Sequence, residues 1–303
     1  FAALRERPDS APLVARYEIA VVPSATLWLH WRGQRRESAP APLLALADPA
    51  PPGSGFWGSL QPAVSRERLG SLPFARREGR SAVHQLGGES LLRVGKAASE
   101  GFLKTADLRR FGILHFATHA VLDDQNPERS GVLLTPAPAS EDGLLQIREI
   151  VPLSLEGRIV VLSSCRSASG AVLRGEGVMG IARAFFQAGA HTVIASLWPL
   201  RDDDGAALFD RFYHHLAGGK SVSAALRAAQ RDRIAEGAPG YAWAGLVALG
   251  EGDLVPLPGG RPETPVAPWV WIAAGAALLL MAAGSVLAWR RHRRVKMKSV
   301  SFS

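Results

Sequence analysis

Cysteine is almost absent from this chain, since only Cys165 occurs among its 303 residues. One cysteine cannot form an intrachain disulfide, so a disulfide framework is excluded and the thiol does not report the redox compartment. The sequence begins Phe-Ala-Ala-Leu-Arg, with neither an initiator methionine nor a signal-peptide pattern. We therefore expect the chain to be the C-terminal part of a longer, regulated protein.

Acidic residues are missing from the C-terminal tail, residues 290–303, which carries most of the net positive charge. The formal charge of the chain is +8, and the tail supplies six of these charges, so about +2 remains for the rest. The basic residues of the tail are Arg290, Arg291, Arg293, Arg294, Lys296 and Lys298. Basicity confined to a short tail gives little support for nucleic-acid binding, and we predict no nucleic-acid partner.

Charge is also absent from residues 269–289, a run of 21 residues with tryptophan at both ends. This run predicts a single transmembrane helix, because a buried core helix normally keeps a polar stripe. Residues 251–268 contain five prolines and are predicted to be a stiff linker to the membrane. The basic tail predicts a cytoplasmic C-terminus and therefore a periplasmic soluble domain, with a cytoplasmic-facing domain as the alternative.

Short apolar runs alternate with helical patterns through residues 1–250. This alternation predicts a three-layer α/β/α domain with a mainly parallel sheet. Strands are expected at 17–22, 43–47, 111–119, 132–134, 158–165, 191–198 and 243–249. Helices are expected after Ser24, at 88–95, 96–108, 177–190 and 221–236, and from 202 to the glycines at 218 and 219, while 143–151 passes from strand to helix. Residues 51–80, rich in proline, glycine, serine and arginine, are predicted to be a loop.

Two of the predicted strands end in residues suited to nucleophilic catalysis. One run ends on Cys165, and another ends on His119, 46 residues earlier. Side chains at the carboxyl ends of neighbouring parallel strands project into the crevice where open α/β sheets place their chemistry. An imidazole that takes the thiol proton there produces a thiolate able to attack a carbonyl. The order and spacing of the pair are similar to those of caspases.

Each of these candidates also has a purely structural interpretation. Buried cysteines are usually inert small hydrophobes, and a lone histidine at a strand end is unremarkable. Small, turn-forming residues around Cys165 favour a strand exit over the middle of the core. His115 is expected to lie deeper than His119 on the same strand face and to be structural. The backbone N–H groups of Ala120 and Cys165 are predicted to form an oxyanion hole.

Metal and nucleotide chemistry receive little support from the sequence. Three histidines lack a cysteine or carboxylate at metal-ligand spacing, so no metal is predicted: His191, His214 and His215. Residues 175–180 match G-x-G-x-x-G, but ten residues separate them from Cys165, whereas the dinucleotide motif follows its strand at once. These glycines are expected to allow close helix packing, and no cofactor is predicted.

Three consecutive acids, Asp202, Asp203 and Asp204, stand where a helix is expected to begin. Negative charge is favourable at the positive end of a helix. As an alternative, one of these carboxylates recognises a basic side chain of a substrate.

The resemblance of this chain to a known family rests on five segments: ILHFATHA, IVVLSSCRSASG, GEGVMGIARAFFQAGAHTVIASLWPLRDDDG, FYHHL and SVSAALRAAQ. Over about residues 15–250 the chain resembles the CHAT-domain family, bacterial caspase-like cysteine peptidases related to separase. The resemblance implies a caspase–haemoglobinase fold and endopeptidase activity without a cofactor. It implies that His119 is the general base, that Cys165 is the nucleophile and that the Ala120 backbone helps to hold the oxyanion. It also implies a helical-repeat or sensor region upstream.

The chain departs from the family pattern at two positions beside the expected dyad. Many members have glycine where this chain has Ala120, and often an acid where it has Arg166. A cation beside a thiol favours the thiolate, and Arg166 joins the three aspartates as a substrate-pocket candidate. We expect a membrane-anchored cysteine endopeptidase that acts on a protein or peptide substrate. The alternative is a catalytically silent scaffold for protein–protein interaction or signalling.

Overall fold

The computed structural model describes residues 2–7, 9–34, 38–50, 72–121, 126–137, 141–163 and 176–260. All of these residues belong to one compact unit, residues 1–262. The predicted membrane span at 269–289 and the tail lie outside the described residues. Among the helices that are described, none has the length and apolar character that crossing a bilayer requires.

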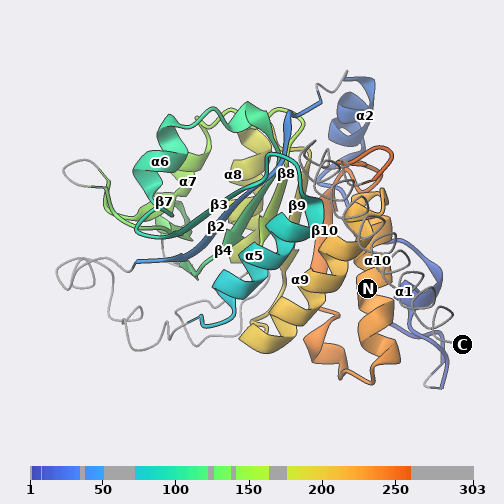
Figure 1. Cartoon of the computed structure of the whole chain (residues 1–303). Coiled ribbons are helices and arrows are strands. Elements are labelled where there is room, and N and C mark those ends of the chain that lie inside the picture. Colours follow the sequence, from blue (N-terminus) through green and yellow to red (C-terminus); the bar gives the residue numbers. More distant parts are fainter. Residues whose placement is uncertain are drawn as a thin grey trace, which may run out of the picture. The chain divides into compact units, whose positions relative to one another are not determined.

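A seven-stranded sheet forms the centre of this unit, with the order β1-β10-β9-β8-β4-β2-β3 (Figure 1). All neighbouring strands in it run parallel except β10, which is antiparallel to β9. The strands are β1 (Ala20–Val21), β2 (Ala41–Pro49), β3 (Leu91–Gly95), β4 (Phe111–Ala117), β8 (Ile159–Leu162), β9 (Thr192–Ser196) and β10 (Leu246–Gly250). The predicted mixed α/β architecture with a mainly parallel sheet is confirmed.

Helices cover both faces of this sheet, as the apolar runs of its strands require. The helices are α1 (Leu13–Arg16), α2 (Ala25–Gly33), α5 (Ala75–Leu86), α6 (Glu100–Thr105), α7 (Ile147–Ile150), α8 (Glu176–Gln187), α9 (Asp202–Ala217) and α10 (Val222–Ala235). Successive strand residues alternate between two apolar clusters: in β4, Ile113 packs with α5, α9 and α10, whereas Leu114 packs with α6, α7 and α8. Figure 1 shows these two helix groups on opposite sides of the sheet.

A small antiparallel sheet begins just after β4 in the sequence. It has the order β5-β6-β7 and consists of β5 (Ala120–Val121), β6 (Gly131–Leu133) and β7 (Leu144–Gln146). The turn from β7 into α7 is a capping box, in which the Glu149 carboxylate accepts the backbone N–H of Gln146 at 2.9 Å. The predicted passage from strand to helix at 143–151 is therefore confirmed.

The predicted helix at 88–95 is wrong, because this segment contains strand β3. Gly87 and Gly88 have φ values of 63° and 59°, left-handed conformations that end α5 and prevent an immediate new helix. Leu91–Gly95 instead pairs in parallel with β2 at the edge of the sheet. Pairing with a neighbouring strand overrides the local helix preference of its leucines.

The predicted loop at 51–80 is wrong over its last six residues, which are the first half of α5. Residues 51–71 of that prediction lie outside the described residues. The arginines of α5 face solvent, and its buried residues recur at helical spacing: Ala75, Glu78, Gly79, Ala82 and Leu86. Because this buried face contains few large apolar residues, composition alone does not reveal it.

Several strands differ in length from their predicted ranges. The expected strand at 17–22 shrinks to Ala20–Val21, whereas β2 extends the predicted 43–47 to Ala41–Pro49. β4 and β8 each stop before the catalytic candidates that follow them in the sequence. The two candidates therefore belong to the segments that leave these strands, at the carboxyl edge of the sheet.

Candidate active site

The carboxyl ends of β4 and β8 lie side by side at one edge of the sheet. The last register pair joins Phe116 to Leu162, and the Ser163 N–H donates to the Phe116 carbonyl at 3.1 Å. The order of the strands reverses next to this point, between β2 and β4, since β2 is followed by β3 on one side and β4 is followed by β8 on the other, and α5 and α6 cover opposite faces. Open α/β sheets place ligands at such a switch point.

His119 is held by its neighbours at this edge. The Thr118 hydroxyl donates to the Leu133 carbonyl, and the Leu133 N–H donates to the His119 carbonyl at 2.8 Å. Both bonds attach the segment after β4 to β6. His119 is 8% exposed, so it stands at the border between the interior and solvent. His115, four residues earlier, is fully buried, as predicted.

The Ala120 N–H points away from the strand with which Ala120 pairs. Ala120 is opposite Val132 in the β5–β6 ladder. The bond from Leu133 N–H to the His119 carbonyl makes this a non-hydrogen-bonded pair, so the Ala120 N–H points away from β6. Strand pairing with β6 therefore leaves this N–H available to another acceptor.

Cys165 and Arg166 lie outside the described residues. The described part of their segment ends at Ser163, two residues before the thiol in the sequence. The structure thus describes the histidine side of the predicted pair and the strand that leads to the cysteine.

A recess opens beside these strand ends, on the face covered by α5 and α9. Its empty space, including the open mouth, is about 420 Å³. Ala117 of β4 and Ser163 after β8 form the wall nearest the predicted dyad. The other lining residues come from α5, from α9 and from the segments that precede them: Leu72, Ala75, Glu78, Leu200, Arg201, Asp202 and Gly205.

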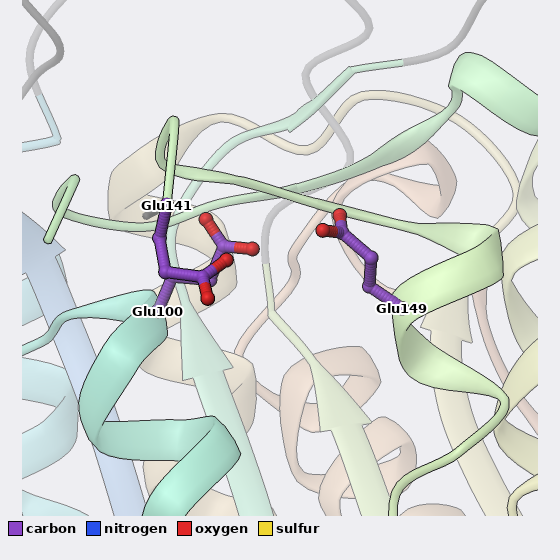
Figure 2. Close-up of side chains that lie close together, drawn as sticks. All are labelled: Glu100, Glu141 and Glu149. Carbon is purple, nitrogen blue, oxygen red and sulfur yellow. The ribbon is translucent and has the colours of Figure 1, made fainter. Parts of the chain in front are cut away.

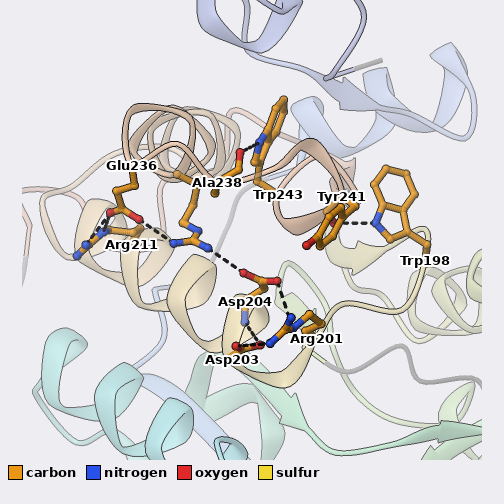
Figure 3. Close-up of polar contacts among 10 residues, drawn as sticks. Trp198, Arg201, Asp203, Asp204, Arg211, Glu236, Ala238, Tyr241 and Trp243 are labelled. Atoms are coloured by element: carbon orange, nitrogen blue, oxygen red, sulfur yellow. Dashed lines mark hydrogen bonds and ion pairs between the residues drawn. The ribbon is translucent and has the colours of Figure 1, made fainter.

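Of the three consecutive aspartates, only Asp202 lines this recess, and its Oδ2 accepts the Phe74 N–H at 3.0 Å. Figure 3 shows the other two in ion pairs. Asp203 contacts Arg201 at 3.0 Å, and this guanidinium lowers the pKa of the Asp203 carboxyl. Asp204 contacts Arg233 of α10 at 2.9 Å. All three are in the first turn of α9, where negative charge is favourable, and the structure gives Asp203 and Asp204 ion-pairing roles there.

Glu78 is a lining residue that the sequence analysis missed. Its carboxylate, 5% exposed, stands on the buried face of α5, and Oε1 lies 2.9 Å from His115 Nε2. On the other side of the imidazole, Nδ1 lies 2.8 Å from the Tyr213 hydroxyl of α9. Glu78 has the helical spacing of the buried residues Ala75 and Ala82. This spacing would have indicated a buried acid if α5 had been predicted as a helix.

One group of carboxylates in the described residues brings its ligand atoms as close together as a metal site does: Glu100, Glu141 and Glu149 (Figure 2). Lys104 contacts all three, at 2.7 Å from Glu100 and 2.9 Å from Glu149, with a short contact to Glu141. Burial lowers the pKa of the Lys104 ammonium, but these three carboxylates outweigh it and raise the pKa overall. An internal ammonium thus supplies the positive charge at this cluster.

Comparison with known families gives one match over most of the chain, in which a model described as the CHAT domain covers residues 1–251. Human tetratricopeptide repeat protein 28 is 27% identical over 287 residues, covering 82% of this chain and 11% of that protein. The mouse protein of the same name is 30% identical over 134 residues, covering 43% of this chain and 5% of that protein. This chain thus spans about a tenth of the length of the human relative.

Two solved structures share part of their architecture with the chain. The complex of Porphyromonas gingivalis RgpB pro- and mature domains has a TM-score of 0.45 at 11% identity, covering 73% of this chain and 49% of that one. The Saccharomyces cerevisiae separase–securin complex has a TM-score of 0.44 at 15% identity, covering 78% of this chain and 14% of that one.

Proposed function

Because the chain belongs to the CHAT-domain family, we propose that it is a caspase-like cysteine endopeptidase with His119 as general base and Cys165 as nucleophile. The register of β4 and β8 carries this proposal. Phe116 and Leu162 are paired, and His119 and Cys165 are each three residues further along their own segments. Two peptide units also keep the Cys165 Cα within about 7.6 Å of the Ser163 Cα.

The reaction begins when His119 takes the proton from the Cys165 thiol, and the thiolate sulfur attacks the carbonyl carbon of the substrate. The negative charge that forms on the carbonyl oxygen is stabilised by the backbone N–H groups of Ala120 and Cys165. The C–N bond breaks as the His119 imidazolium gives its proton to the leaving amine. Water, deprotonated by His119, then hydrolyses the thioester and restores the thiol.

The test is cleavage of a peptide library by the purified full chain. We expect both Cys165→Ala and His119→Ala to lose cleavage, while His84→Ala, which changes an exposed histidine of α5, retains it. Equal cleavage by the wild type and Cys165→Ala contradicts the proposal. A peptide chloromethyl ketone reports the state of the thiol independently. A protein that neither cleaves nor reacts with this probe is instead the catalytically silent scaffold.

We also propose that residues 269–289 anchor the enzyme in a membrane with the peptidase domain outside the cytoplasm. The support is the uncharged run with its flanking tryptophans and the basic tail. Protease treatment of intact spheroplasts is expected to remove the domain. A domain that resists digestion until the cells are lysed contradicts this orientation.

A helical-repeat region is proposed to precede the peptidase domain in the whole protein. The support is that the curated relatives are named tetratricopeptide repeat proteins and are far longer than this chain. The test is the sequence encoded immediately upstream of Phe1. Helix pairs that repeat about every 34 residues are expected there. A stop codon directly upstream contradicts the proposal.

A further inference from the structure

Helix α2 has four large apolar side chains, of which only Trp31 is buried: Leu27, Trp28, Leu29 and Trp31. The Trp31 ring packs on Phe186, with ring centroids 5.3 Å apart. Leu29 precedes Trp31 by two residues, which places it about 200° away around the helix, and it is 62% exposed. The apolar sequence of α2 therefore reaches the core at one position and faces solvent at another.

Exposed apolar side chains are concentrated in the first part of the chain. Within the described residues, seven large apolar side chains are exposed, and five of them belong to residues 4–29: Leu4, Tyr17, Val21, Val22 and Leu29. Val21 ends the edge strand β1, and Val22 follows it shortly before α2 begins. Single exposed apolar residues are ordinary in soluble proteins, whereas such a concentration marks an interaction surface.

Helix α2 carries positive charge and no negative charge. It contains His30 and Arg32 but no acid, and Arg35 and Arg36 follow it in the sequence. The Arg32 guanidinium lies 4.9 Å from the centre of the Trp28 ring. Leucine and tryptophan beside basic residues are typical of helices that lie in the interface between water and a bilayer, where basic groups are attracted to anionic headgroups.

The segment that follows β10 is attached to the domain beside α2 (Figure 1). Arg32 of α2 contacts Asp253 at 3.3 Å. The carbonyls of Gly252 and Leu254 accept the first two N–H groups of α10, each at 2.9 Å, and Leu257 still packs in the core. Residues 251–260, the first part of the predicted linker, are thus held by the domain.

The rest of the predicted linker is short. Residues 261–268 are the eight residues between this attached segment and the predicted membrane span. A chain of this length reaches about 30 Å when it is fully extended. A span that begins at residue 269 therefore keeps the α2 end of the domain close to the bilayer surface.

Helix α2 and the recess are at opposite ends of the sheet. β10 runs antiparallel to β9, and its last residue, Gly250, is opposite Thr192, the first residue of β9. Gln34, which follows α2, lies 3.0 Å from His191, directly before β9. Asp202 follows the other end of β9 and lines the recess. Contact of α2 with a membrane therefore leaves the recess on the far side of the domain.

We infer that α2 lies in the interface of a lipid bilayer, with Trp28, Leu29 and the preceding Val21 and Val22 between the headgroups and the acyl chains. This inference rests on the proposed membrane anchor at 269–289 and adds the surface with which the domain lies on that membrane. It also adds an orientation, in which the recess faces away from the lipid. The proposed enzyme then cleaves polypeptide segments that extend into the water phase rather than segments at the bilayer surface.

The first experiment measures the contact of α2 with lipid. Cys165→Ala leaves the full chain without cysteine, so that a nitroxide can be attached to one new cysteine. Three variants on this background are reconstituted into vesicles of phosphatidylcholine and phosphatidylglycerol: Leu29→Cys, Tyr241→Cys and Leu279→Cys. Tyr241 is the matched control, because it is 57% exposed and lies shortly before β10, at the recess end of the sheet. We expect EPR power saturation to show the Leu29 label more accessible to oxygen and less accessible to a nickel chelate than the Tyr241 label.

The Leu279 label, within the predicted span, reports separately whether the anchor is inserted. If Leu279 is in lipid and Leu29 is as accessible to the nickel chelate as Tyr241, the inference is overturned and the anchor stands. Low accessibility of Leu29 to both reagents also overturns it, since protein, such as a second copy of the chain, then covers α2. A Leu279 label that is open to the nickel chelate contradicts the anchor, and the inference with it.

A second experiment tests the orientation. A fluorophore on Cys165→Ala/Tyr241→Cys transfers energy to rhodamine-labelled lipid in the same vesicles. We expect low transfer, because the label is far from α2, and higher transfer after Leu29→Glu, which removes an apolar contact with lipid and lets the domain rotate on its linker. Val151→Glu introduces the same charge at an exposed apolar residue outside α2 and is expected to leave the transfer low. Equal transfer with and without Leu29→Glu contradicts the proposed orientation.

Discussion

The Thr118 hydroxyl donates to the carbonyl of Leu133, on the strand that also binds the backbone of the next residue, His119. Thr118 is 2% exposed, so both ends of this bond are shielded from water. The general base of the proposed mechanism is therefore not held by β4 alone. It also depends on β6, a strand of the small second sheet.

Thr118→Val is expected to remove this bond while the shape of the side chain is kept. The Leu133 carbonyl then lacks a buried partner, and the free energy of unfolding should fall by about 1 kcal/mol. If Thr118 positions His119, kcat should fall more than KM changes. Denaturant unfolding and steady-state kinetics measure the two effects. Thr105→Val removes an exposed hydroxyl that bonds its own helix and is expected to change neither.

Gly131 is the residue at which β6 has no room for a side chain. A Cβ there would lie 2.4 Å from the Leu145 backbone oxygen in β7. Gly131→Ala is expected to force β6 and β7 apart and to lower the free energy of unfolding by about 2–3 kcal/mol. Peptidase activity should fall with it, since β6 holds the His119 backbone. Gly33→Ala, where no atom lies within 4 Å, is the control in thermal melts, and equal melting of both variants contradicts the steric argument.

Lys104 holds the carboxylates of Glu100, Glu141 and Glu149 together. Lys104→Met removes the ammonium and leaves the fully buried Glu100 beside Glu141 and Glu149, so stability at pH 7 should fall by about 3 kcal/mol. Burial already raises the pKa of the Glu100 carboxyl, and loss of the Lys104 ammonium, whose hydrogen bond lowers that pKa, raises it further. The folded variant then binds protons more tightly than the unfolded one, and its stability should recover as the pH falls towards 4. Urea unfolding between pH 4 and 8 measures this. A loss of stability in Lys104→Met that has the same size at every pH contradicts this explanation.

The Glu236 carboxylate is expected to stabilise the folded protein at neutral pH and to lose this effect in acid. Hydrogen bonds from Arg211 and Arg233 lower the pKa of its carboxyl below the ordinary value of 4.5. A lowered pKa in the folded state stabilises the fold above pH 4.5 and ceases to do so as the pH falls through the folded value. Glu236→Gln should therefore cost less than about 1 kcal/mol at pH 7, because the carboxylate is partly exposed. The difference from the wild type should vanish near pH 3 in urea titrations, and a difference that persists there contradicts the assignment.

The central strands and the long helices could be predicted because the order of apolar and polar residues within each segment indicates its secondary structure. β4 and β8 are continuous apolar runs, and α9 and α10 bury residues at helical spacing. The positions of β3 and α5 could not be predicted in this way. Leu91–Gly95 becomes a strand because β2 offers it an open edge, and α5 buries small residues and one acid.

The same division applies to the candidate site. Strand-end patterns single out His119 and the approach to Cys165, because both belong to segments whose local sequence predicts a buried strand followed by a turn. These patterns do not show which of Asp202, Asp203 and Asp204 lines the recess, because the three residues are chemically identical and consecutive in the sequence. The choice depends on Arg201 and Arg233, of which the second is contributed by a different helix.

The sequence by itself determined the layered fold with its parallel sheet, and it determined which strand ends carry the candidate base and nucleophile. These features follow from the order of apolar and polar residues along single segments. Only the tertiary structure decided that Glu78 lies in the recess, backed by His115 and Tyr213. Those three residues come from α5, β4 and α9, and only the packing of both helices on one face of the sheet brings them together.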